Sequence, residues 1–82
     1  MRGNEALLTA ARVVVIDLEI QGANLQNKRA LRKVEMAVWK RHRLMAQNGY
    51  ARLTSRSWRD VSPSWRGRYR KLAQQAIALE VM

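Results

Sequence analysis

Few residues of this 82-residue sequence could take part in acid–base or metal chemistry. The single histidine, His42, lies in a strongly basic stretch, with Glu35 as an acid two helical turns away. General acid–base catalysis needs paired carboxylates or a histidine tuned by its neighbours, so we expect His42 to be a solvated or rim residue. Cysteine is absent, and the spacing of acids and histidine matches no metal site. The sequence therefore predicts a protein that is not an enzyme and has no cofactor or metal.

Positive charge dominates the remaining chemistry. Fourteen of the sixteen lysines and arginines lie between Lys28 and Lys71, where Glu35 and Asp60 are the only acids, and the whole chain has a net charge of +10. Arginine outnumbers lysine twelve to four. Its planar guanidinium group is suited to bidentate hydrogen bonds with phosphate or carboxylate. Such a cationic body predicts an anionic partner, either a nucleic acid or an acidic protein surface.

We expect the cations of several helices to form one binding surface. The leading prediction is a small nucleic-acid-binding protein, for DNA more than RNA, that neutralises phosphates with modest sequence preference. About six phosphate contacts would give a logarithmic salt slope of about −5 on duplex DNA. The expected binding residues are Arg29, Arg32, Lys33, Lys40, Arg41, Arg43, Arg52, Arg56, Arg59, Arg66 and Arg70.

Two alternatives stay open. The first is a small inhibitor or adaptor of the kind that phages and other mobile elements encode, whose basic face binds an acidic or nucleic-acid-binding host protein. The second, a basic helix on an anionic membrane, is disfavoured because the apolar faces are needed for a core. The apolar runs at 13–16 and 76–79 are too short to cross a bilayer and no signal peptide is evident, so we expect no membrane association and a cytoplasmic location.

Scarce breakers predict an all-α fold of three to four helices in a single domain, 1–82. Its parts would be an N-terminal helix over about 5–21, with Asn4 as the N-cap, and a basic helical body over about 25–80. Residues 12–21 also alternate as a strand would, but a lone strand has no pairing partner here. The apolar stripe of the first helix is broad and suggests a homodimer; it consists of Leu7, Leu8, Ala11, Val14, Val15 and Leu18.

The basic body should contain three further helices. The second runs from Leu25 or Asn27 to Asn48 and stops at Gly49, and a short third covers 53–60. The fourth begins with Ser62 as N-cap and Pro63 as first residue. The expected core is Leu31, Val34, Val38, Leu44, Leu53, Trp58, Val61, Trp65, Tyr69, Leu72 and Ile77. Trp39, at the edge of its stripe, is the best candidate for a partly exposed ring that could stack on a base or pair with an arginine, but a ring that covers the core is favoured.

One stretch resembles a known family. Trp58-Arg59-Asp60-Val61-Ser62, with Tyr69 eleven and Ala73 fifteen positions after the tryptophan, is similar to the junction between helices 2 and 3 of HMG-box domains. The resemblance implies helical packing and, by extension, DNA binding in the minor groove with bending. The wedge residue of that family has no matching position here, and the N-terminal helix is extra. The same spacing also resembles small phage-type helical proteins of unknown role.

Overall fold

The fold is a bundle of three α-helices. A computed structural model describes residues 2–49, 52–53 and 57–81, with α1 at Arg2–Ile20, α2 at Lys28–Gln47 and α3 at Pro63–Val81. The expected all-α class is confirmed. The expected short helix over 53–60 is wrong in extent: Leu53 lies outside any helix, residues 54–56 lie outside the described residues, and a single 3-10 turn, η1 at Trp58–Asp60, precedes α3.

Helix α1 extends through the segment whose alternation resembled a strand. Leu7, Ala11, Val15 and Leu18 are all buried, and their spacing of three or four residues follows the helical period. Packing of this stripe overrides the weak helix preference of the β-branched residues. The expectation of Asn4 as N-cap is wrong, because α1 already begins at Arg2 and Asn4 lies inside it.

The burial of that stripe corrects the basis of the predicted homodimer. The apolar residues of α1 that we expected to be free for a second copy face α2 and α3 instead, where four are buried and Leu8 and Val14 pack against the core. The apolar residues that α1 leaves exposed are Val13, Ile16 and Ile20.

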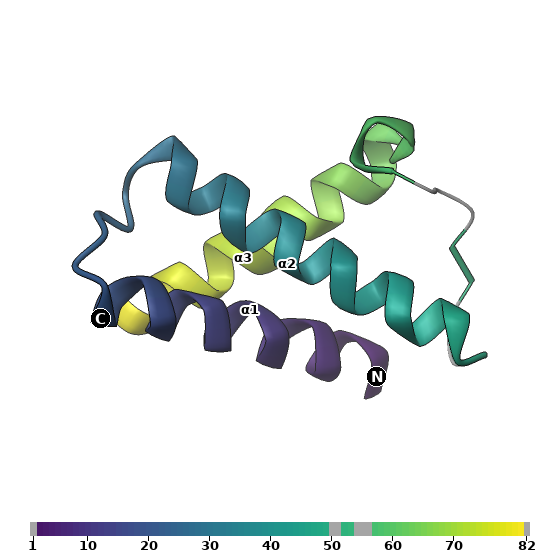
Figure 1. Cartoon of the computed structure of the whole chain (residues 1–82), viewed down its shortest axis with the longest axis horizontal. Coiled ribbons are helices and arrows are strands. Elements are labelled where there is room, and N and C mark those ends of the chain that lie inside the picture. The colour runs from purple at the N-terminus through teal and green to yellow at the C-terminus, as the bar shows by residue number, and fades with distance from the viewer. Residues whose placement is uncertain (1, 50–51, 54–56, 82) are drawn as a thin grey trace.

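Local signals fix where each helix ends. After α1, Gly22 has a φ of +77°, and the N–H groups of Gly22 and Ala23 donate to the carbonyls of Glu19 and Leu18, the paired bonds of a Schellman motif. At the start of α2, the Asn27 side chain accepts a hydrogen bond from the N–H of Arg29 at 2.9 Å. These two caps turn the chain within a few residues, so α2 returns antiparallel to α1 (Figure 1).

The expected end of α2 and start of α3 are confirmed, whereas α2 begins at Lys28, one residue after the later of the two expected starts. Asn48 is the C-cap of α2, followed by Gly49 with a φ of +81°. The Ser62 hydroxyl accepts from the N–H of Trp65 at 3.3 Å, and Pro63 is the first residue of α3. Proline at this position forgoes an N–H that would have no intrahelical partner.

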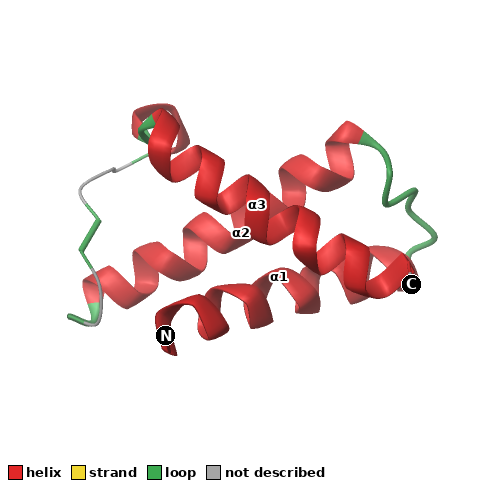
Figure 2. Ribbon diagram, turned by 180° about the vertical axis from the view of Figure 1, so that it is seen from behind, coloured by secondary structure: helices red, strands yellow, loops and turns green. Residues whose placement is uncertain are grey.

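The three helices contact one another pairwise, and α3 crosses α2 and α1 obliquely (Figures 1 and 2). In both views the C-terminal ends of α1 and α3 lie close together. Along the described part of the chain, none of the helices is long and apolar enough to cross a membrane.

The core draws on all three helices. Four of the expected residues, Val34, Val38, Val61 and Tyr69, are buried, whereas Leu44 is 50% exposed, which corrects its place in the expected core. Leu44 lies at the outer edge of the α2 stripe, where no facing helix covers it. Partly buried residues of the expected set pack around the centre: Leu31, Leu53, Trp58, Trp65, Leu72 and Ile77.

Candidate functional site

An aromatic cluster holds α2, η1 and α3 together beneath the basic residues. Trp39 and Trp58 meet edge to face, with ring centroids 5.9 Å apart, and Trp65 stacks on Tyr69 at 5.9 Å. Trp39 is only 5% exposed, so it covers the core, which was the favoured interpretation, and it is not the partly exposed ring. The half-buried rings are Trp58 and Trp65 instead.

His42 belongs to this cluster, which corrects its expected place at a solvated rim. It is 5% exposed, and its Nδ1 lies 2.8 Å from the Tyr69 hydroxyl oxygen. Burial, followed by repulsion from Arg68, lowers the pKa of His42. Burial also raises the pKa of Tyr69 to about 12. Both groups are thus held neutral near pH 7, and their hydrogen bond joins α2 to α3 inside the bundle.

Arginines cover the outer faces of the tryptophans. The guanidinium carbons of Arg43, Arg66 and Arg68 lie 5.5, 5.1 and 4.7 Å from the ring centroids of Trp39, Trp58 and Trp65, respectively. Such cation–π contacts contribute about 0.5–1 kcal/mol each at exposed sites. They also orient the arginines, because a planar guanidinium resting on a ring loses part of its rotational freedom before any ligand arrives.

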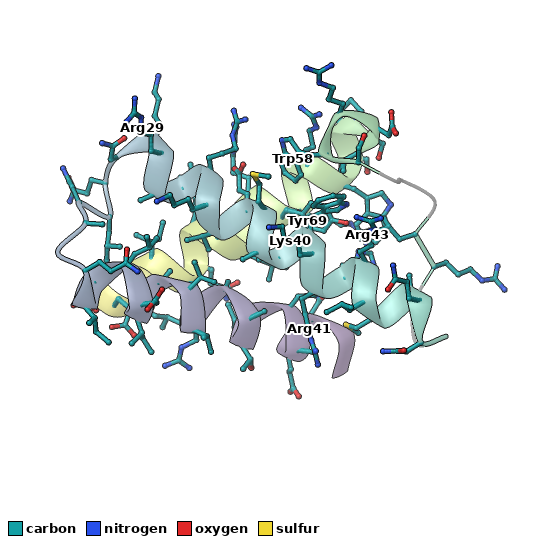
Figure 3. The ribbon with its side chains drawn as sticks, viewed as in Figure 1. Arg29, Lys40, Arg41, Arg43, Trp58 and Tyr69 are labelled. Atoms are coloured by element: carbon teal, nitrogen blue, oxygen red, sulfur yellow. The ribbon has the colours of Figure 1, made fainter. Side chains whose placement is uncertain are left out.

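Most of the expected binding residues of α2 lie on one side of that helix. All are exposed, and the 3.6-residue period places them within one strip opposite the buried face: Arg29, Arg32, Lys33, Lys40 and Arg43. Arg41 departs from the strip and projects toward α1 (Figure 3). The helical period thus gives these five residues one shared side of the helix, and α2 bears one continuous basic face.

Arg32 of this strip also lines an open cleft between α2 and the first half of α3. The cleft has a volume of about 270 Å³ and is lined by Arg32, Glu35, Trp58, Pro63, Arg66, Gly67 and Arg70. The two helices thus bring Arg32 of α2 together with Arg66 and Arg70 of α3, which lie more than thirty residues later in the sequence.

Two of these arginines are held by partners inside the fold. Arg66 Nη2 donates to the backbone carbonyl of Trp58 at 2.7 Å, with a longer contact of 3.4 Å to that of Arg59. Arg70 Nε donates to Glu35 Oε1 at 2.9 Å. Arg32 has no recorded polar partner among the described residues.

From the sequence, Glu35 was considered only as an acid two helical turns away from His42. Its side chain is 4% exposed while that of Arg70 is 60% exposed, so the carboxylate forms the floor of the cleft and the arginine its rim. A buried carboxylate without a partner is strongly unfavourable. An acid on an otherwise basic helix was the available signal for such a pairing, but the identity of its partner depends on how α3 crosses α2.

Two further expected residues are not part of the lining of the cleft. Arg59 is exposed in η1, and Arg52 is exposed in the connection before it. Arg56 lies outside the described residues. Two basic residues of α3 that were not among the expected set, Arg68 and Lys71, line a separate cleft near Asn4 of α1.

Acidic residues concentrate at another end of the bundle. Asp17 and Glu19 are exposed on the last turns of α1, and Glu80 lies at the end of α3. A hydrogen bond with Glu80, followed by desolvation and mutual repulsion, raises the pKa of Glu19. The protein therefore has opposite charges at separate places: acids where α1 and α3 end, and cations along α2 and the start of α3.

The comparisons give no independent assignment. No protein-family model matches the chain, no curated protein matches it, and no solved structure matches it. The resemblance of residues 58–73 to HMG-box domains accordingly stays an expectation.

Proposed function

We propose that the protein binds nucleic acid through the basic strip of α2 and the adjoining arginines of α3. The observation that carries this proposal is the cleft in which Arg32, Arg66 and Arg70 meet, at the edge of the strip, around a carboxylate that is itself buried. A protein surface that only has to be soluble in water can carry acidic and basic side chains mixed together. A surface that concentrates guanidinium groups and withdraws its acid from solvent is suited to phosphate.

The length of the strip fits a polyphosphate ligand. Arg29 to Arg43 spans fourteen residues, which is about 21 Å along a helix that rises 1.5 Å per residue. About six base-pair steps of duplex DNA cover the same distance. The strip and the cleft together can thus neutralise about six phosphates, which supports the expected salt slope of about −5. Contacts of this kind favour affinity over sequence discrimination, because phosphates are the same in every sequence.

A titration across a salt series tests this function. Duplex DNA, single-stranded DNA and RNA would be labelled in turn and bound to the protein while fluorescence anisotropy is recorded. We expect binding at low salt with a slope near −5 on duplex DNA. The double variant Lys33→Ala, Lys40→Ala should reduce the slope by about two, since each phosphate contact contributes about 0.9. Absence of binding to all three nucleic acids at low salt would exclude the proposal.

The same surface could instead grip an acidic protein, and one experiment separates the two. A tagged protein would be used to capture partners from an extract with and without nuclease treatment. Capture that is lost after nuclease supports nucleic-acid binding. A defined protein that is retained after nuclease, and released by Lys33→Ala, Lys40→Ala, would favour the inhibitor or adaptor instead.

We also propose that self-association, expected from the sequence, uses the outer face of α1. Two copies of α1 packed antiparallel with Val13 against Ile16 would place Arg12 of each copy opposite Asp17 of the other, an arrangement with twofold symmetry. This face carries both signs of charge, so two highly basic molecules can approach there. Ile16→Glu should shift the sedimentation coefficient to that of a monomer, whereas a wild-type protein that is monomeric at high concentration would contradict the dimer.

A further inference from the structure

We propose that the cleft between α2 and α3 binds a terminal phosphomonoester of a nucleic-acid strand, so that the protein recognises strand ends in addition to the backbone. This inference rests on the proposed nucleic-acid binding and adds a specific ligand group to it. It is carried by the charge of the cleft, by the way its arginines are held, and by a glycine that the fold itself does not require.

The arginines of the cleft are positioned before a ligand arrives. Arg66 is held by the carbonyl of Trp58 at 2.7 Å and by the ring of Trp58 beneath it. Arg70 is held through its Nε by Glu35, which leaves both terminal nitrogens of that guanidinium group without a recorded partner among the described residues. Because these side chains are already ordered, the entropic cost of ordering them when a ligand binds is smaller. A single tetrahedral anion can therefore accept hydrogen bonds from two fixed guanidinium groups and from the freer Arg32.

The charge of the cleft matches a dianion. Three guanidinium groups and the single carboxylate of Glu35 leave two positive charges around one small space. A phosphomonoester carries about −1.5 to −2 at pH 7, because its second pKa is about 6, whereas a backbone phosphodiester carries a single charge. A strand end thus gains more from this cleft than an internal phosphate does, while the strip of α2 binds either.

Gly67 supplies the second observation. It lies in the second turn of α3 and lines the cleft, and a Cβ added there would meet nothing within 4 Å. Its φ is not in the left-handed region, so neither backbone conformation nor packing calls for glycine. A glycine inside a helix costs about 1 kcal/mol relative to alanine. Local rules of this kind are broken most often at functional sites. Here the missing side chain of Gly67 leaves that part of the cleft lining open to a ligand.

The size of the cleft sets what enters. At about 270 Å³ it is smaller than most pockets for whole drug-sized ligands, which begin at about 300 Å³. A phosphate and part of the sugar that carries it fit this space, and the strand continues outside along the α2 strip.

Oligonucleotides that differ only at their ends test the inference. One sequence would be prepared with a 5′-phosphate, with a 3′-phosphate and with hydroxyl groups at both ends, and binding would be followed by anisotropy of an internal label at physiological salt. We expect the wild-type protein to bind at least one phosphorylated strand about tenfold more tightly than the hydroxyl-ended strand, the effect of one added hydrogen bond between charged groups. Inorganic phosphate at millimolar concentration should remove this preference.

Variants connect the preference to the cleft. Gly67→Glu places a carboxylate in the cleft and should abolish the preference while it retains salt-dependent binding of the hydroxyl-ended strand. Arg32→Ala should also abolish the preference, and because Arg32 belongs to the strip it should weaken binding of the hydroxyl-ended strand by the loss of one phosphate contact. Gly67→Ala, which adds only a methyl group, should raise stability by about 1 kcal/mol and reduce the preference without abolishing it, so it separates folding from access to the cleft. Lys40 lies on the strip outside the cleft, so Lys40→Ala should weaken binding of all strands by the same factor.

The outcomes separate this inference from the function on which it rests. Equal wild-type affinity for phosphorylated and hydroxyl-ended strands, with salt-dependent binding intact, would overturn the inference and leave the function standing. Loss of binding to every strand would remove both. A phosphoserine peptide bound more tightly than the phosphorylated strand would overturn the assignment to nucleic acid, because the cleft would then serve a phosphoprotein.

Discussion

Loss of the Arg70 side chain should destabilise the bundle, although most of that side chain is exposed to water. Arg70→Ala leaves the Glu35 carboxylate, whose side chain is 4% exposed, without its recorded partner. Removing one member of a fully buried ion pair costs about 3–5 kcal/mol. Because the Arg70 side chain is 60% exposed, water can reach the stranded carboxylate, and we therefore expect about half that loss, about 2 kcal/mol. For a domain of this length the melting temperature should fall by about 8–16 °C.

A second substitution shows whether the stranded charge is the cause. In Arg70→Ala, Glu35→Met the carboxylate is replaced by an apolar side chain of similar length, and such replacements of buried pairs are often neutral or stabilising. We expect the double variant to regain most of the lost stability, measured by thermal and urea unfolding followed by circular dichroism. Arg32 has no acidic partner within the described part of the chain, so Arg32→Ala should change stability by no more than about 0.5 kcal/mol. If the double variant is as unstable as Arg70→Ala, the pairing is not what holds α2 and α3 together at this position.

Three other substitutions probe the fold and the surface. Acidification below pH 6.5 should lower the free energy of unfolding by up to about 1.4 kcal/mol per pH unit, because the unfolded chain binds a proton at His42 more readily than the folded protein does. His42→Gln should therefore flatten the dependence of melting temperature on pH. Trp58→Ala should lower the free energy of unfolding by about 3 kcal/mol, read from urea denaturation, because it removes the ring between Trp39 and Arg66. Charge reversal at Arg43 should weaken DNA binding in a shift assay with only a small change in melting temperature.

Much of the bundle was accessible from local sequence signals. The Ser62–Pro63 start and the Asn48–Gly49 stop act through neighbouring backbone groups, so they hold in any fold that contains these helices. The 3.6-residue period likewise placed the basic strip of α2 opposite its buried face. Over the described residues of 53–60, the expected helix is reduced to a single 3-10 turn at Trp58–Asp60.

The cleft depends on contacts that no local pattern encodes. Glu35 and Arg70 are thirty-five residues apart, and His42 and Tyr69 twenty-seven. Both pairs form only because α3 crosses α2 at one particular angle. His42 was expected near solvent for the same reason: periodicity gives the face of a helix, but not which of its edges the next helix covers.

The crossing of α2 and α3 affects both the stability of the bundle and the shape of the proposed binding cleft. The same contacts that hold Arg66 and Arg70 in place also fix the start of α3 against α2, so the cleft exists only while the aromatic cluster beneath it is packed. Clustered positive charge opposes that packing through self-repulsion. An anion in the cleft relieves this repulsion and binds the folded state alone, so a ligand at one hundred times its dissociation constant should stabilise the fold by about 2.7 kcal/mol. Gly67→Glu places a fixed negative charge at the same position, and it should therefore gain part of this stability while losing the strand-end preference, a combination that a merely misfolded variant cannot produce.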